Sequence, residues 1–299
     1  MRCARMPCWP VLIVLLVAAC SSAVSAEPPE AVGQSPRSQA PASPSPTPQA
    51  SPSPPPPAPP AVTVSSFRAA DGTRITLARF SGAVTYQLHS GSSDPGSRAL
   101  DVVQAGPSVP PWEHQMLLAA FNGGFLLSAG DGGYEEEGHV IAPLRPGLAS
   151  LVIDTAGHAQ LGAWGDGVPS LGTPVYSVRQ NLSLLVTGGR PSSSASDWTV
   201  WGATLGGGEF VARSALGQTA SGDLVYAGSM STSPADLAAA LVSAGAVSGM
   251  ELDINPEWVQ LDVSSQPGGP LAAEIPGQNR PADQYLVGWT RDFITVLGY

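Results

Sequence analysis

The sequence predicts an α+β fold: a strand-rich mixed sheet with few helices, in a single globular domain that follows a disordered linker. Three observations support this prediction. Short apolar or alternating runs recur along the chain, and Gly, Asp and Pro separate them. One segment has helical spacing with clear start and stop signals. A stretch rich in Pro, Ser and Ala precedes the domain and has too few large apolar residues to build a core.

The first 19 residues have the pattern of a bacterial lipoprotein signal peptide. Arg2 and Arg5 precede the apolar run 11–19, which is too short to span a bilayer because a span needs about 20 apolar residues. Small residues then precede Cys20, whose thiol would accept a lipid carrying fatty acyl chains such as palmitate. An ordinary signal peptide cut after Ala26 is the alternative. We therefore expect a secreted protein, lipid-anchored on the extracytoplasmic face of the cell membrane.

The segment 20–61 contains mostly Pro, Ser, Ala and Gln and includes four consecutive prolines at 54–57. Such a composition favours an extended polyproline tether. From residue 62 to residue 299 the composition becomes that of a globular domain, and its length fits a single core.

Composition also excludes several classes of protein. All 13 basic residues are Arg, so no lysine is present for a P-loop or a Schiff base. The net charge of -10 gives no electrostatic reason to bind nucleic acid. Once the signal peptide is removed, Cys20 is the one remaining cysteine. An internal disulfide, thiol catalysis and a cysteine metal site are therefore excluded from the mature domain. The oligomeric state is left open.

The predicted strands come mainly in the first half of the domain. Two of them alternate in polarity and flank a turn at Ser81-Gly82. The others are apolar runs, and a turn at 154–157 leads into the last. The five predicted strands are 74–80, 84–88, 117–121, 148–153 and 159–161.

One helix is well marked in the second half. Ser233 is a suitable N-cap, Pro234 fits the first helical position, and Asp236 completes a capping box. Gly245 is the expected C-terminal signal. The apolar residues that share one face of this helix are Leu237, Ala240, Leu241 and Ala244. Strands at 224–227 and 247–254 flank the helix, so we expect a β-α-β unit.

The first candidate site is the segment Asn122-Gly123-Gly124, which follows an apolar strand. Consecutive glycines allow a sharp reversal and present backbone N–H groups that can converge on an anion. The alternative is a plain hairpin turn.

The second candidate site follows from alternation along the strand 247–254. Glu251, Asp253 and Asn255 would share one face, with neighbouring carboxylates about 6.6 Å apart, while Met250, Leu252 and Ile254 point to the core. Paired carboxylates suit general acid–base work or a hard cation. Glu257 and Trp258 would lie on the loop that follows, where the indole could stack on a sugar ring. A solvated strand face is the alternative.

The third candidate is Arg213, in the segment 213–217, because a guanidinium can hold a phosphate by two hydrogen bonds. The four histidines show no ligand spacing, and no metal or cofactor is predicted. The acidic loop 130–138 and the acids of the second site leave calcium open as a divalent cation.

Taken in chain order, these segments resemble the phosphodiester glycosidase family. Its members typically carry an Asn-Gly-Gly-Phe turn after an apolar strand, here 122–125, and later an Arg-Thr-Ala-x-Gly segment, here 213–217. A turn into a strand follows at 222–224, then a Leu- and Ala-rich helix that ends in Gly-Ala at 245–246, then a strand with Asp253. The resemblance covers roughly residue 67 to the C-terminus. It departs from the family where Asp-Gly-Gly-x-Ser is usual, since this chain has Asp-Ile-Asn-Pro-Glu from Asp253.

The resemblance implies hydrolysis of a sugar-1-phosphodiester, and export points to cell-envelope glycans as substrate. Asn122, the Gly123 and Gly124 amides and Arg213 would hold the phosphate, with Asn255, Glu257 and Trp258 as further substrate-binding residues. Asp253 or Glu251 would transfer the proton. A non-catalytic glycan- or protein-binding module on the same scaffold is the alternative. A calcium-dependent adhesin that uses Glu251, Asp253 and Glu257 is a third interpretation.

Overall fold

The computed structural model describes residues 60–130, 132–202 and 207–299. The predicted signal peptide, Cys20 and nearly all of the predicted tether lie outside the described residues. Within the described residues, no helix is both long and apolar enough to cross a membrane. All of them belong to one unit of the chain, 56–299.

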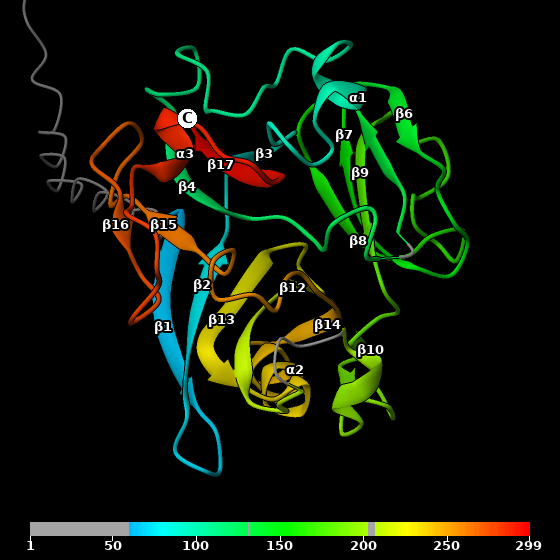
Figure 1. The fold of residues 1–299 in the computed structure, drawn as a ribbon, viewed down its shortest axis with the longest axis vertical. Coiled ribbons are helices and arrows are strands. Elements are labelled where there is room, and N and C mark those ends of the chain that lie inside the picture. Colours follow the sequence, from blue (N-terminus) through cyan, green and yellow to red (C-terminus); the bar gives the residue numbers. More distant parts are fainter. Residues whose placement is uncertain (1–59, 131, 203–206) are drawn as a thin grey trace, which may run out of the picture. The chain divides into compact units, whose positions relative to one another are not determined.

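The largest sheet has seven strands and includes the strand of the second candidate site (Figure 1). Its strands in spatial order are β1 (Val62–Arg68), β2 (Arg74–Phe80), β13 (Leu224–Thr232), β12 (Val211–Thr219), β14 (Ala246–Glu251), β10 (Val186–Thr187) and β11 (Arg190–Pro191). The predicted β-α-β unit is present as β13, helix α2 (Pro234–Ser243) and β14, with β12 lying between the two strands.

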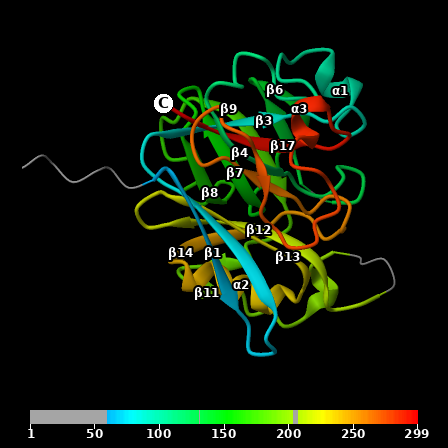
Figure 2. The ribbon, with the colours of Figure 1, turned by 90° about the vertical axis from the view of Figure 1, so that its left-hand side faces the viewer.

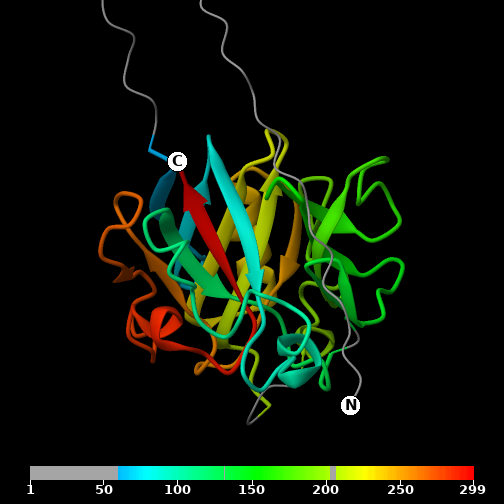
Figure 3. The same cartoon turned by 90° about the horizontal axis from the view of Figure 1, so that it is seen from above.

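Two further sheets have five strands each. The second sheet contains β16 (Ala272–Ala273), β15 (Leu261–Val263), β4 (Leu117–Asn122), β17 (Phe293–Gly298) and β3 (Val84–His89). Figure 3 shows β17, in red, running beside its neighbours in this sheet. The third sheet contains β6 (His139–Ala142), β5 (Tyr134–Glu136), β9 (Val175–Asn181), β7 (Ala149–Asp154) and β8 (Ala159–Ala163).

Helices are few and mostly short. Besides α2, the described residues form α1 (Ser97–Leu100), α3 (Gln284–Val287) and one 3-10 turn, η1 (Trp198–Val200). The predicted strand-rich α+β fold is confirmed. Every pair of named strands is antiparallel, where the sequence had suggested a mixed sheet.

Side chains on both faces of β2, a strand inside the seven-stranded sheet, are buried. In β2, Ile75 and Leu77 pack with α2, whereas Ala78 and Phe80 pack into the core that the sheet shares with the other two sheets. Figure 2 shows α2 on the side of this sheet that faces away from β4 and β17.

The ends of α2 follow the predicted signals. The Ser233 hydroxyl accepts a hydrogen bond from the Asp236 amide at 3.1 Å and donates to its carboxylate at 2.8 Å. Gly245, just past the helix, has a φ of 87°, a conformation that suits glycine. The apolar face buries Leu237, Ala240 and Leu241 against the sheet.

Candidate functional site

A pocket of about 200 Å³ lies where the chain leaves β14. Three other segments complete its wall: one after β4, one after η1 and one before β17. The lining residues are Phe125, Leu126, Ala129, Gly202, Asp253, Ile254, Asn255, Trp258 and Arg291. Three of the residues predicted to form the site, Asp253, Asn255 and Trp258, therefore line one pocket, together with apolar side chains such as Phe125 and Leu126.

Two local turns build the wall after β14. One carboxylate oxygen of Asp253, Oδ1, accepts hydrogen bonds from the amides of Ile254 at 2.7 Å and Asn255 at 2.9 Å. The Asn255 side chain then accepts from the Glu257 amide at 2.9 Å. Asp and Asn favour such turns because a short side chain can bond the backbone two residues on. The other oxygen of Asp253, Oδ2, is left for a neighbouring arginine.

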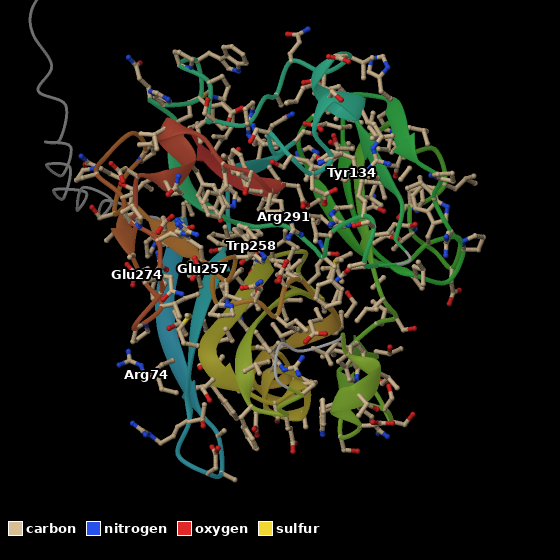
Figure 4. The ribbon with its side chains drawn as sticks, viewed as in Figure 1. Arg74, Tyr134, Glu257, Trp258, Glu274 and Arg291 are labelled. Carbon is tan, nitrogen blue, oxygen red and sulfur yellow. The ribbon has the colours of Figure 1, made fainter. Side chains whose placement is uncertain are left out.

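That arginine is Arg291. Its Nη2 donates to the Gly124 carbonyl at 2.8 Å and lies 3.4 Å from Asp253 Oδ2, a long contact for an ion pair. Nη1 has no hydrogen-bond partner among the described residues. The guanidinium also lies over the Trp258 ring, 5.2 Å from its centroid, and Figure 4 shows the two side chains next to each other. The pocket thus contains a cation whose hydrogen-bonding capacity is only partly used.

The environment of Asp253 raises its pKa to about 6. Burial is the main cause, since the residue is only 4% exposed and a carboxylate loses its hydration there. Arg291 and the two backbone amides act in the opposite direction, and the nearby Asp292 adds a smaller upward effect. A carboxyl group that changes its protonation state near neutral pH is suited to proton transfer.

The segment Asn122-Gly123-Gly124 does not form a hairpin, because it leads from β4 of the second sheet to β5 of the third. Its amides do bond an acidic residue, but one within the protein. Gly123 donates to the Asp292 carbonyl at 2.9 Å, and Gly124 donates to the Asp292 carboxylate at 3.2 Å. A Cβ on Gly123 would lie 1.9 Å from Asp292 Oδ2, so this close approach requires glycine.

The Asn122 side chain is also committed to the core. Its Nδ2 donates to the Ser214 hydroxyl at 2.9 Å, and its Oδ1 accepts from the Tyr226 hydroxyl at 2.9 Å. The Ser214 hydroxyl in turn accepts from the Asp253 amide at 3.2 Å. Asn122 therefore supports the backbone of Asp253 from behind and does not line the pocket.

Glu251 and Arg213 are fully buried and pair with each other, with Oε1 and Nη1 2.7 Å apart. Arg213 also donates to the Trp201 carbonyl at 3.1 Å. Burial raises the pKa of Glu251 to about 8, against the influence of Arg213. Neither side chain lines the pocket. The alternative of a solvated strand face is wrong for Glu251, since its side chain is fully buried and pairs with Arg213.

The remaining predicted acids also have structural partners. Glu257 is paired with Arg280 and accepts from the Asn279 side chain at 2.9 Å. In the loop 130–138, Glu137 accepts from two backbone amides of the segment 104–105, at 2.7 and 2.8 Å. Within the part of the chain that the structure describes, no group of three His, Cys, Asp or Glu side chains could hold a metal ion.

Arg291, which provides the positive charge of the pocket, was not predicted from the sequence. Neither was its neighbour Asp292, nor Asp94, whose Oδ2 lies 3.9 Å from Arg291 Nε. The one sequence signal for them is an Arg-Asp pair directly before the apolar run 293–298. Without knowledge of which strands are neighbours, such a pair has the appearance of a surface turn.

No family model and no curated protein sequence matches this chain. Among solved structures, the catalytic domain of zebrafish N-acetylglucosamine-1-phosphodiester alpha-N-acetylglucosaminidase, auto-inhibited by its pro-peptide, matches with a TM-score of 0.47 and 12% identity over 80% of this chain and 82% of that chain. A hypothetical protein from Synechocystis matches with a TM-score of 0.45 and 12% identity, over 80% of this chain and 62% of that chain. These are similarities of fold, and the site is therefore argued from its own geometry.

Proposed function

We propose that this domain hydrolyses sugar-1-phosphodiester linkages in cell-envelope glycans, and that the pocket after β14 is its active site. One observation carries the proposal: in one pocket, a carboxyl group with a pKa of about 6, Asp253, faces an arginine with an unused nitrogen, Arg291, beside the indole of Trp258. The order of motifs along the sequence supports the same reaction.

Each of the three groups has a chemical role in this reaction. The guanidinium of Arg291 bonds a phosphodiester oxygen. Trp258 and the apolar wall around Phe125 contact the sugar ring. Asp253 transfers a proton while the bond between C1 of the sugar and the phosphate oxygen breaks. The electron pair leaves with that oxygen, and water adds to C1, so the products are a free sugar and a phosphomonoester.

The test is an assay of the purified protein with a synthetic sugar-1-phosphodiester, with and without EDTA. We expect release of free sugar and phosphomonoester in equal amounts, at the same rate in EDTA. Arg291→Lys should raise KM because a single ammonium replaces the guanidinium fork. Arg79→Lys is the matched control, since Arg79 pairs with Asp223 away from the pocket. Failure to release sugar would overturn the proposal. Loss of turnover in EDTA would show instead that the reaction depends on a divalent cation.

A second candidate is a non-catalytic module that binds glycans or another protein. It is favoured by the fact that Asp253 is the one carboxylate on the pocket wall among the described residues, whereas most glycosidases use two. Binding of the phosphodiester without turnover in the same assay would select this candidate.

We also propose that the protein acts outside the cytoplasmic membrane, held there by lipid on Cys20. The support is the sequence pattern around Cys20. Cys20→Ser should abolish the lipid mass and release the protein into the medium. A Cys20→Ser protein that stays membrane-bound, with no lipid mass on the wild type, would contradict the anchor.

A further inference from the structure

The cation of the pocket is shared by two carboxylates before any ligand binds. Arg291 lies 3.4 Å from Asp253 Oδ2 through Nη2 and 3.9 Å from Asp94 Oδ2 through Nε. Asp94 is held in turn by the Leu127 amide at 3.0 Å. An anion that bonds Arg291 adds its negative charge to a guanidinium that Asp253 already contacts, because the nitrogens of the guanidinium belong to one planar, charged group.

We propose that binding of a phosphodiester anion to Arg291 is coupled to the uptake of one proton by Asp253, so that the bound substrate generates its own general acid. This inference rests on the proposed function, because it takes Arg291 as the phosphate-binding group. It goes further by stating when Asp253 acquires the proton that it transfers and by linking affinity to pH.

The physical reason is competition between two negative charges for one positive charge. In the free pocket, Arg291 favours the ionised form of Asp253. A bound anion offsets that charge and adds a like charge at close range, while it also displaces water. Each of these effects favours the protonated carboxyl. Because the pKa of Asp253 is already about 6, a modest further rise takes it past neutral pH.

Apart from Tyr285, the other titratable groups around Asp253 are each held by a partner. The Tyr285 hydroxyl has no hydrogen-bond partner among the described residues, and burial raises its pKa well above its usual value. Asp292 pairs with Arg179 at 2.7 Å, and Glu251 pairs with Arg213 at 2.7 Å. The hydroxyl of Tyr226 donates to Asn122, and burial raises its pKa further from neutrality. No histidine lines the pocket among the described residues. A proton taken up on anion binding is therefore assigned to Asp253.

Proton uptake makes Asp253 the general acid of the reaction. The protonated Asp253 donates its proton to the phosphate oxygen as the bond from that oxygen to C1 breaks. The phosphomonoester therefore leaves with a hydroxyl at that oxygen. The attacking water gives its oxygen to C1, and its proton returns to the Asp253 carboxylate or to solvent. The carboxyl group is thus a general acid in the first half of the reaction.

The experiment is isothermal titration calorimetry of the whole protein with dimethyl phosphate, a monoanion that does not titrate over the pH range used. At pH 7, in buffers of different ionisation enthalpy, the observed heat should vary with the buffer and give an uptake of about half a proton or more per anion bound. Affinity should fall several-fold as the pH rises from about 6 to 8, because a proton-coupled complex weakens as protons become scarce.

Two variants complete the test. Asp253→Asn should bind dimethyl phosphate with no proton uptake and no pH dependence. Asp262→Asn is the matched control, because burial also raises the pKa of Asp262, to about 7. The Asp262 side chain bonds Gln260 and Gln278 away from the pocket, so this variant should bind and take up protons as the wild type does. Binding without uptake, or uptake retained in Asp253→Asn, overturns this inference and leaves the proposed function standing. An absence of binding removes the phosphate site of the proposed function, and this inference with it.

Discussion

Two buried arginine–aspartate pairs of this domain differ in the separation of their charges, in the hydrogen bonds of their arginines and in their access to the pocket. Arg179 and Asp292 are 2.7 Å apart, and Arg179 also donates to the carbonyls of Gln180 and Phe125. Arg291 and Asp253 are 3.4 Å apart, and Nη1 of Arg291 has no hydrogen-bond partner among the described residues. The first pair has no surface on the pocket, whereas the second forms part of its wall.

The difference shows how neighbouring residues can have separate tasks. Arg291 and Asp292 are adjacent in sequence just before β17, and successive side chains of an extended chain point to opposite sides. Asp292 fixes the glycine turn after β4, and Arg291 reaches the pocket. A short, saturated ion pair holds the fold together, whereas a long pair with unused capacity can exchange its partner for a ligand.

The largest effect should come from the Arg291–Asp253 pair. Asp253→Asn is nearly isosteric, and its amide oxygen can still accept from the Ile254 and Asn255 amides. We expect kcat to fall by about 10²- to 10⁴-fold, because a general acid is lost. The free energy of unfolding, measured by urea titration, should change little. Asp262→Asn should keep wild-type turnover, and a fully active Asp253→Asn enzyme would contradict the role of Asp253.

For the Arg179–Asp292 pair we expect the reverse, a loss of stability as the main effect of substitution. Asp292→Asn removes the charge that neutralises Arg179, which is only 2% exposed. Breaking a buried ion pair in this way costs about 3–5 kcal/mol, because the remaining charge stays buried. Urea unfolding would measure this loss. If Asp292→Asn were as stable as the wild type, the division between a structural and a functional pair would fail.

A smaller effect is expected where the glycine turn meets Asp292. Gly123→Ala would place a methyl group 1.9 Å from the Asp292 carboxylate, and relief of such a clash typically costs about 1–3 kcal/mol. Gly106→Ala is the control, because a Cβ there meets no atom within 4 Å. Equal thermal midpoints for the two variants would show that the turn tolerates a side chain.

The sequence predicted the local features of this structure well. Alternation located β2 over its full length, and the capping signals located α2. Gly82, with a φ of 76°, forms the expected turn, but it connects β2 of the first sheet to β3 of the second. A sequence pattern shows that a chain turns and does not show which strand it pairs with afterwards.

The same limit explains the outcome at the site. Asp253 and Asn255 were predicted on the face of a strand 247–254, and Trp258 on the loop after it. Strand β14 ends at Glu251, so all three residues lie in the segment that follows, and they line the pocket there. Arg213 and Glu251 had the right chemistry, yet both are fully buried and bond each other, and Arg213 also donates to the Trp201 carbonyl. Arg291 lies near the C-terminus, just before β17. It reaches the pocket because β17 pairs with β4, whose following segment also lines the pocket.

If Asp253 is the acid of the reaction, its titration governs the pH dependence of kcat/KM. This ratio reports the free enzyme, in which the pKa of Asp253 is raised to about 6 from its usual value of 3.8. The protonated form is the active one, so kcat/KM for a sugar-1-phosphodiester should be constant below about pH 6 and fall close to tenfold per pH unit above it. Asp253→Asn should lack this break. A wild-type profile that rises with pH through the same region, or that stays flat from about pH 5 to about 8, would show that Asp253 is not the acid.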